Sequence, residues 1–150
     1  MKYSFKNDYA EGAHPRILEA LTQSNLVQQS GYGLDDYSEN AAVILKQKIN
    51  NPKAKVFFVS GGTQANLIVI SAFLRPHESV VSAATGHIFT NESGAIEATG
   101  HKVHAIETSN GKINSDDIQK ILDVHQNKPH QVKQKLVYIS NSTEVGTIYS

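Results

Sequence analysis

Residues 56–73 read VFFVSGGTQANLIVISAF and join two apolar segments through a pair of glycines. Val56 to Val59 has the length and the β-branched and aromatic content of a short buried strand. Ser60-Gly61-Gly62 is typical of a turn, and residues 63–74 are apolar enough for a helix packed against a sheet. Glycines at such a turn let the backbone approach a ligand closely. The stretch therefore predicts a strand–turn–helix unit.

The N-terminus of that helix is a candidate phosphate site. Its first N–H groups have no partner inside the helix, and it carries roughly half a positive charge. Thr63 adds a hydroxyl at the same place. A glycine turn without a ligand is the alternative. A P-loop is not indicated, since no lysine stands at the turn, nor is a dinucleotide site, since the next strand ends without a carboxylate at Ser82-Ala83-Ala84.

The composition is that of an ordinary folded protein rather than a disordered one. The chain has 150 residues, 39% of them hydrophobic and 19% charged, and its 14 Lys and Arg balance 14 Asp and Glu. This balance indicates no nucleic-acid or membrane partner. The lack of cysteine excludes a disulfide framework and zinc–thiolate sites. No signal peptide or bilayer-spanning run is recognisable, and we expect a cytoplasmic protein.

Helical and strand patterns alternate along the rest of the chain. Such alternation predicts βαβ units and a parallel sheet. The expected helices are one opened by His14-Pro15, one from an N-cap at Ser38 through Lys48, short turns within 91–100, and one capped by Ser115; the further strands are 79–82, 102–106 and 136–140, with 126–135 as a loop.

Ligands of parallel sheets lie beyond the C-terminal ends of the strands. Loops 60–63, 84–92 and 141–146 are expected there. His87, in the second loop, offers an imidazole that can lie flat on a heteroaromatic ring; a merely solvated histidine is the alternative. His101 and His104 alternate on a strand and point to opposite faces, so no metal site is predicted.

Taken together, these motifs resemble those of the threonine aldolase / aromatic amino acid β-eliminating lyase family of enzymes, which depend on pyridoxal 5′-phosphate (PLP). They occur in the family's order and spacing across nearly the whole chain. The specific signal is H-I-x-x-x-E-x-G-A following a Gly-Thr-x-x-Asn turn. The matching segments are Asn7-Asp8, YGLD at 32–35, FVSGGTQAN at 58–66, HIFTNESGA at 87–95, Gly100 and LVYISN at 136–141.

The resemblance implies a role for each matching residue. Gly62-Thr63 corresponds to the pair that binds the cofactor phosphate, and His87 to the histidine stacked on the pyridine ring. Glu92 corresponds to a glutamate near the ring, so His87 and Glu92 are the candidate catalytic residues. Tyr32 matches a tyrosine at the edge of the active site. Asn7 stands where the family usually has a serine that contacts the substrate carboxylate.

Two positions depart from the family pattern. The usual Ser-Gly-Thr is Gly61-Gly62-Thr63 here, which preserves the phosphate-binding pair. The usual Glu-Asn-Thr-His at a strand end is Ser140-Asn141-Ser142-Thr143, so that Thr143 replaces a histidine associated with the substrate hydroxyl. The second departure implies a divergent subgroup.

The resemblance also implies an architecture: an α/β fold with a mostly parallel sheet and helices on both faces, the PLP-dependent transferase-like large domain. Residues 1–55 form an N-terminal arm and helices, and residues 56–150 the N-terminal part of the PLP-binding domain. In the family the Schiff-base lysine and the carboxylate paired with the pyridine nitrogen follow the last strand found here. Lysines in this chain, such as Lys46 and Lys135, do not occupy that context.

The implied activity is that of a threonine aldolase-like lyase. The full enzyme would cleave Cα–Cβ of a β-hydroxy amino acid to give glycine and an aldehyde, as a homodimer or homotetramer, while the present chain is not expected to be active alone. Two alternatives stay open: a β-eliminating amino-acid lyase of the same family, and a non-catalytic module that binds a phosphorylated ligand.

Overall fold

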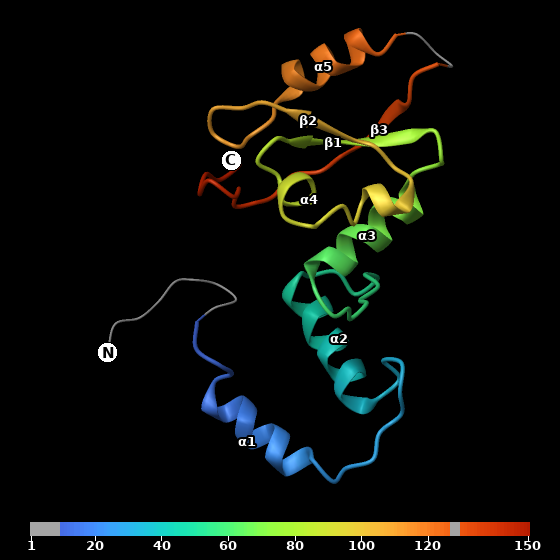
Figure 1. Cartoon of the computed structure of the whole chain (residues 1–150). Coiled ribbons are helices and arrows are strands. Elements are labelled where there is room, and N and C mark those ends of the chain that lie inside the picture. Colours follow the sequence, from blue (N-terminus) through green and yellow to red (C-terminus); the bar gives the residue numbers. More distant parts are fainter. Residues whose placement is uncertain (1–9, 127–129) are drawn as a thin grey trace. The chain divides into compact units, whose positions relative to one another are not determined.

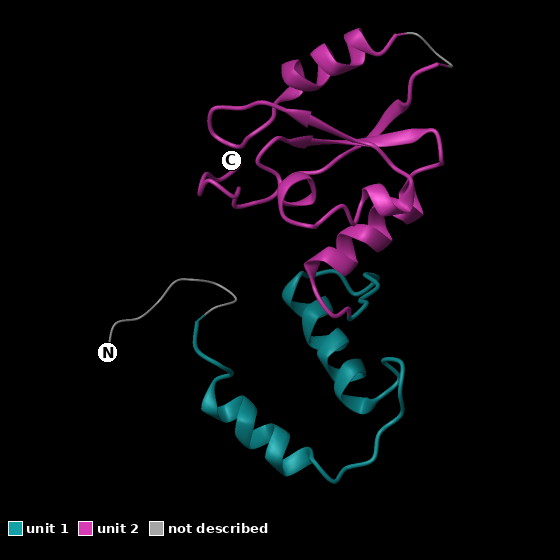
Figure 2. Ribbon diagram, in the orientation of Figure 1, with its two compact units in different colours: residues 1–58 teal, residues 59–150 magenta. Residues whose placement is uncertain are grey.

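The computed structural model describes residues 10–126 and 130–150. The chain divides into two compact units, Met1–Phe58 and Val59–Ser150 (Figure 2). No helix among the described residues combines the length and the apolar character needed to cross a membrane.

The first unit contains helices α1 (Pro15–Ser24) and α2 (Asp36–Lys48). Pro15 opens α1, as predicted, because a first-turn residue needs no N–H partner. The predicted N-cap of α2 at Ser38 is wrong. Asp35 is the N-cap, and its carboxylate accepts hydrogen bonds from the N–H (2.8 Å) and the hydroxyl (2.7 Å) of Ser38. These bonds lower the pKa of the Asp35 carboxyl, since they favour its charged form.

The predicted strand at Val56 to Val59 is not formed. These residues have no regular secondary structure, and the side chains of Phe57 and Phe58 are 79% and 54% exposed. An apolar run becomes a strand only when another strand hydrogen-bonds to it. Among the described residues, none pairs with this run.

The second unit is built on a parallel sheet of three strands. The strands are β1 (Glu78–Ala83), β2 (Val103–Ile106) and β3 (Lys133–Val137), in the order β2-β1-β3 (Figure 1). Val80, at the centre, aligns with Val103 on one side and Leu136 on the other. The predicted parallel α/β fold is therefore confirmed.

Strand β3 begins earlier than the predicted range of 136–140. Lys133 and Gln134 align with Glu78 and Ser79 of β1, although the sequence of residues 133–135 resembles a loop. Ladder hydrogen bonds use only the backbone, so the edge of a sheet tolerates polar side chains. Hydrophobicity alone therefore placed this strand too late.

Helices cover both faces of this sheet. Helix α5 (Ser115–Val124) lies on one face, and helices α3 (Gly62–Phe73) and α4 (His87–Thr90) lie on the other (Figure 1). Successive β1 residues point to opposite faces and join two apolar clusters. Burying each large aliphatic side chain contributes about 1.5–3 kcal/mol. The clusters are Ile70, Leu74, Val80, Ile88, Ile96 and Val103, and Val81, Ala83, Ile106 and Ile113.

The starts of α5 and α4 also differ from the predicted positions. Asn114, rather than Ser115, caps α5, in a capping box with Asp117. The helical turn of α4 begins at His87, inside the predicted loop, and a short 3₁₀ helix, Glu97–Thr99, follows it. Gly100 ends that turn with φ of 84°, a left-handed conformation that favours glycine.

Candidate functional site

His87 is brought to the C-terminal end of the sheet by a sharp turn after β1. The strand ends at Ala83, and α4 begins at His87 with Gly86 as its N-cap. A Cβ at Gly86 would lie 2.1 Å from the Ser82 hydroxyl, so no larger residue fits there without rearrangement. The close approach of this turn to β1 places the histidine where parallel sheets bind their ligands.

The His87 imidazole is held by a buried carboxylate. Its Nδ1 lies 2.9 Å from Oε1 of Glu92, whose side chain is completely buried, whereas 44% of the His87 side chain is exposed. The amide of Asn66 donates to the same oxygen at 2.6 Å. An ionised carboxylate only accepts hydrogen bonds. With Glu92 as the acceptor, Nδ1 is the donor of this pair, and Nε2 makes no hydrogen bond among the described residues.

The second carboxylate oxygen of Glu92 has no protein partner. Oε2 is buried and makes no hydrogen bond among the described residues. A buried oxygen without a partner is unfavourable by about 1–3 kcal/mol. An oxygen of this kind, beside a half-exposed imidazole, fits a site that a polar ligand completes.

The N-terminal turn of α3 presents unoccupied backbone donors. No side chain caps this helix, and the Gln64 amide oxygen instead binds the N–H (2.7 Å) and hydroxyl (2.8 Å) of Ser60. Gly62 and Thr63 are exposed, and no other atom lies within 4 Å of a Cβ position at Gly62. Asn66 follows Thr63 by about one turn. Its bond to Glu92 ties this end of α3 to the His87 loop.

The loop after β3 contributes a residue that the sequence analysis did not single out. The carboxylate of Glu144 accepts the backbone N–H of His87 at 2.8 Å and the Ser140 hydroxyl at 2.5 Å. Glu144 is the only acidic residue of the loop predicted at 141–146. That feature was the available signal, although the sequence does not reveal which partner the carboxylate reaches.

Three other residues have predicted or family-related roles. Asn7 lies outside the described residues. Tyr32 lies in the first unit, where it is fully exposed with φ of 62°. Thr143, which stands in place of the family's histidine, is buried and bonds to Thr147.

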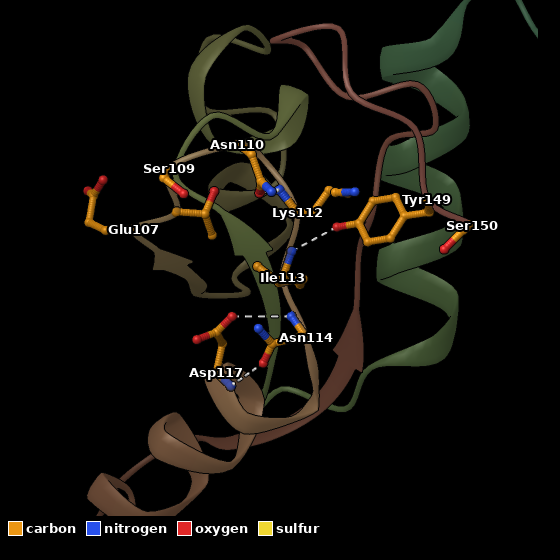
Figure 3. Close-up of a pocket in the computed structure, with 10 residues that line it drawn as sticks. Glu107, Ser109, Asn110, Lys112, Ile113, Asn114, Asp117, Tyr149 and Ser150 are labelled. Carbon is orange, nitrogen blue, oxygen red and sulfur yellow. Dashed lines mark hydrogen bonds between the residues drawn. The ribbon is translucent and has the colours of Figure 1, made fainter.

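A polar cavity of about 510 Å³ lies away from His87, between the end of β2 and the start of α5 (Figure 3). Tyr149 and Ile113 both line it, and the Tyr149 hydroxyl accepts a hydrogen bond from the backbone N–H of Ile113 at 2.8 Å. None of Gly62, Thr63, His87 or Glu92 lines this cavity. We therefore place the candidate site at the His87 loop, on its chemistry rather than on the size of the hollow. Among residues 10–126 and 130–150, no group of three or more His, Asp or Glu side chains could hold a metal ion.

Known proteins similar to this chain are lyases. The chain matches the family model described as beta-eliminating lyase over residues 14–150. It is 30% identical to the low specificity L-threonine aldolases of Pseudomonas aeruginosa and of a second Pseudomonas strain, over 97% of its own length and 42% of theirs. It is also similar to a solved structure of Leishmania major threonine aldolase, with 49% identity and a TM-score of 0.92, over 99% of this chain and 43% of that one.

The chain thus spans less than half the length of the relatives that it matches. Within that span the likeness is continuous, since the family model covers all but the first residues and the α/β fold superimposes on a threonine aldolase. The chain therefore belongs to the beta-eliminating lyase family, whose members, the threonine aldolases among them, depend on pyridoxal 5′-phosphate.

Proposed function

We propose that this chain binds PLP as part of an amino-acid lyase of the threonine aldolase type. The observation that carries the proposal is the His87 imidazole, half exposed and fixed by the buried Glu92, next to a helix N-terminus with open donors. Gly62, Thr63 and His87 are the proposed cofactor-binding residues. Family membership supplies the class of cofactor.

The phosphate of PLP fits the N-terminal turn of α3. The N–H groups of Gly62 and Thr63 form none of the hydrogen bonds found among the described residues, and no side-chain cap competes for them. A dianion is stabilised there by these donors and by the helix dipole. The Thr63 hydroxyl adds a third donor, and the lack of side chains at Gly61 and Gly62 leaves room for the phosphate oxygens.

The pyridine ring is proposed to lie against the imidazole of His87. Glu92 fixes the plane of the imidazole and keeps a hydrogen on Nδ1, so Nε2 remains able to accept or donate a proton beside the ring. The buried Oε2 of Glu92 is satisfied if a donor enters with the ligand. Bound PLP supplies an electron sink for bond cleavage at Cα of an amino acid.

The proposed reaction is the cleavage of a β-hydroxy amino acid to glycine and an aldehyde. It is supported by the relatives at 30% and 49% identity, which are named threonine aldolases. β-Elimination from an amino acid is the second candidate, favoured by the description of the family model. Asn7 and Tyr32 are the proposed substrate-binding residues. The whole enzyme is proposed to be a cytoplasmic homodimer or homotetramer, with residues 56–150 in its PLP-binding domain.

Titration with PLP, followed by the induced circular dichroism of the cofactor, tests this proposal. Thr63→Val and His87→Ala should each weaken binding about tenfold, the effect of one charge-assisted hydrogen bond or one ring contact. Thr22→Val is the matched control, because Thr22 is a helical threonine that bonds only within α1. Equal affinity in all three variants, or no induced signal in the unaltered protein, would exclude the assignment. Release of glycine from L-threonine by the whole enzyme separates aldol cleavage from β-elimination.

A further inference from the structure

Helix α4 begins with a hydrogen bond from a distant part of the chain. The helix has only four residues, and its N-cap Gly86 offers no side chain to bind its first N–H groups. The N–H of His87 instead donates to Oε1 of Glu144, 57 positions later in the sequence. The residue that presents the imidazole is thus anchored at its backbone by a carboxylate from the loop after β3.

Glu144 is itself held in a turn with several hydrogen bonds. The N–H of Gly146 donates to the carbonyl of Thr143 at 2.9 Å, and Gly146 has φ of 84°. The N–H of Thr143 donates to the carbonyl of Thr147 at 2.8 Å. The Thr147 hydroxyl donates to the Asn110 carbonyl at 2.6 Å, which ties the turn to the loop after β2. The backbone that carries the exposed carboxylate of Glu144 is therefore fixed by hydrogen bonds.

A second contact acts on the carboxylate itself. The Ser140 hydroxyl donates to the same oxygen that accepts from His87. His87 is thus fixed at two atoms by two carboxylates: its backbone N–H by Glu144 and its ring Nδ1 by Glu92. Two anchors on either side of the Cα–Cβ bond restrict the directions that the imidazole plane can take.

We infer that Glu144 is a positioning residue, which sets the place of the His87 imidazole through the backbone at the start of α4. The inference rests on the proposed function in that His87 is taken to face the cofactor. The competing interpretation is that the bond between Glu144 and His87 only stabilises the loop and does not affect the position of the imidazole. The two interpretations predict different outcomes. If Glu144 positions His87, its loss changes the behaviour of His87 itself, and glutamine can substitute for it because the side-chain oxygen of glutamine accepts the same hydrogen bond.

The test uses the unaltered chain, Glu144→Ala, Glu144→Gln and the control Glu107→Ala. Glu107 is an exposed carboxylate after β2 that makes no hydrogen bond among the described residues. The first measurement, without cofactor, is amide hydrogen exchange at His87. We expect Glu144→Ala to speed this exchange about tenfold, as loss of one hydrogen bond predicts. Glu144→Gln and Glu107→Ala should stay within about threefold of the unaltered chain.

The second measurement is PLP affinity, which should fall about three- to tenfold in Glu144→Ala and recover in Glu144→Gln. Unchanged His87 exchange in Glu144→Ala, or a Glu144→Gln variant as impaired as the alanine variant, overturns the inference while the proposed function stands. If the unaltered chain does not bind PLP, the proposed function fails, and hydrogen exchange still decides whether Glu144 positions His87. If Glu144→Ala does not fold, Ser140→Ala, which removes the bond that steadies the carboxylate, should show the same His87 effect in weaker form; no effect there also overturns the inference.

Discussion

One oxygen of Glu92 accepts two hydrogen bonds, while the other, equally buried, accepts none among the described residues. A carboxylate used only for folding would be expected to have both oxygens satisfied. The unequal use of the two oxygens is the most direct sign that the site is completed by another group. The family resemblance identified Glu92 from its spacing to His87, but only the structure shows that the two side chains touch.

Thr143 shows how a substitution at a family position can change its role. Its side chain is 5% exposed, and its hydroxyl bonds to Thr147. A Cβ placed on Gly111 would lie only 3.1 Å from that hydroxyl, so the surroundings are tightly packed. In this fold the residue at 143 faces the protein interior and serves the turn that carries Glu144.

We therefore predict that Thr143→His destabilises the chain by about 1–3 kcal/mol, because a larger ring cannot enter this space without strain. Thr143→Ser keeps the hydroxyl and should cost roughly 1 kcal/mol or less. Urea denaturation measures both. If Thr143→His were as stable as the unaltered chain, the interior role of this position would be refuted.

Capping residues illustrate what single residues in a sequence can and cannot predict. The existence of α2 and α5 was predicted, but their caps were placed at Ser38 and Ser115 instead of Asp35 and Asn114. All four residues are of good capping types. The N-cap is the last residue before the helix whose φ and ψ angles are not helical, and the loop that precedes the helix decides which residue that is.

The elements that were predicted correctly share a strong local pattern. Helix α5 has a periodic apolar face, whereas β1 and α3 are continuous apolar segments bounded by turns. The run 56–59 had the pattern of a strand but lacks a partner among the described residues, whereas the first residues of β3 have a partner but a polar sequence. A strand forms only where two chain segments pair, so the sequence of one segment alone does not determine it.

Between β2 and α5, two histidines predict a pH-dependent stability. The rings of His104 and His125 meet edge to face, with centroids 4.6 Å apart. Burial lowers the pKa of His104 to about 4, and the neighbouring His125 and Lys102 add to this shift. An unfolded histidine titrates near 6.5. The unfolded chain therefore binds the proton more tightly, and stability falls as the pH drops from about 6.5 towards 4.

Urea midpoints at pH 7 and pH 5 measure this effect. We expect the midpoint of the unaltered chain to fall at the lower pH, and the fall to be smaller in His104→Gln. His130→Gln, which alters an exposed histidine outside the strands, should keep the full decrease. An identical pH response in all three proteins would show that His104 does not titrate below its unfolded value.

At the scale of the molecule, many large apolar side chains of the described residues are exposed. Phe57 and Phe58 stand side by side in sequence, more than half exposed, within the run that was expected to be buried. Large apolar side chains exposed in this way promote association.

We predict that the unaltered chain associates as its concentration rises, and that replacing Phe57 and Phe58 together by serine reduces this association. Tyr32→Ser, which removes an exposed aromatic ring elsewhere, should leave it unchanged. Sedimentation velocity over a range of concentrations is the measurement. A sedimentation coefficient that is independent of concentration in every variant would contradict the prediction.

The bond between His87 and Glu144 has a consequence for how the chain folds. It joins residues 57 positions apart, and it needs β3 already in place beside β1. Contacts this distant in sequence form slowly, because the intervening chain must first be closed into a loop. We expect the helices and the β1–β2 pair, whose contacts are nearer in sequence, to form earlier. The histidine would then acquire its final orientation in the last steps of folding, and a chain without β3 in place would lack the proposed cofactor site.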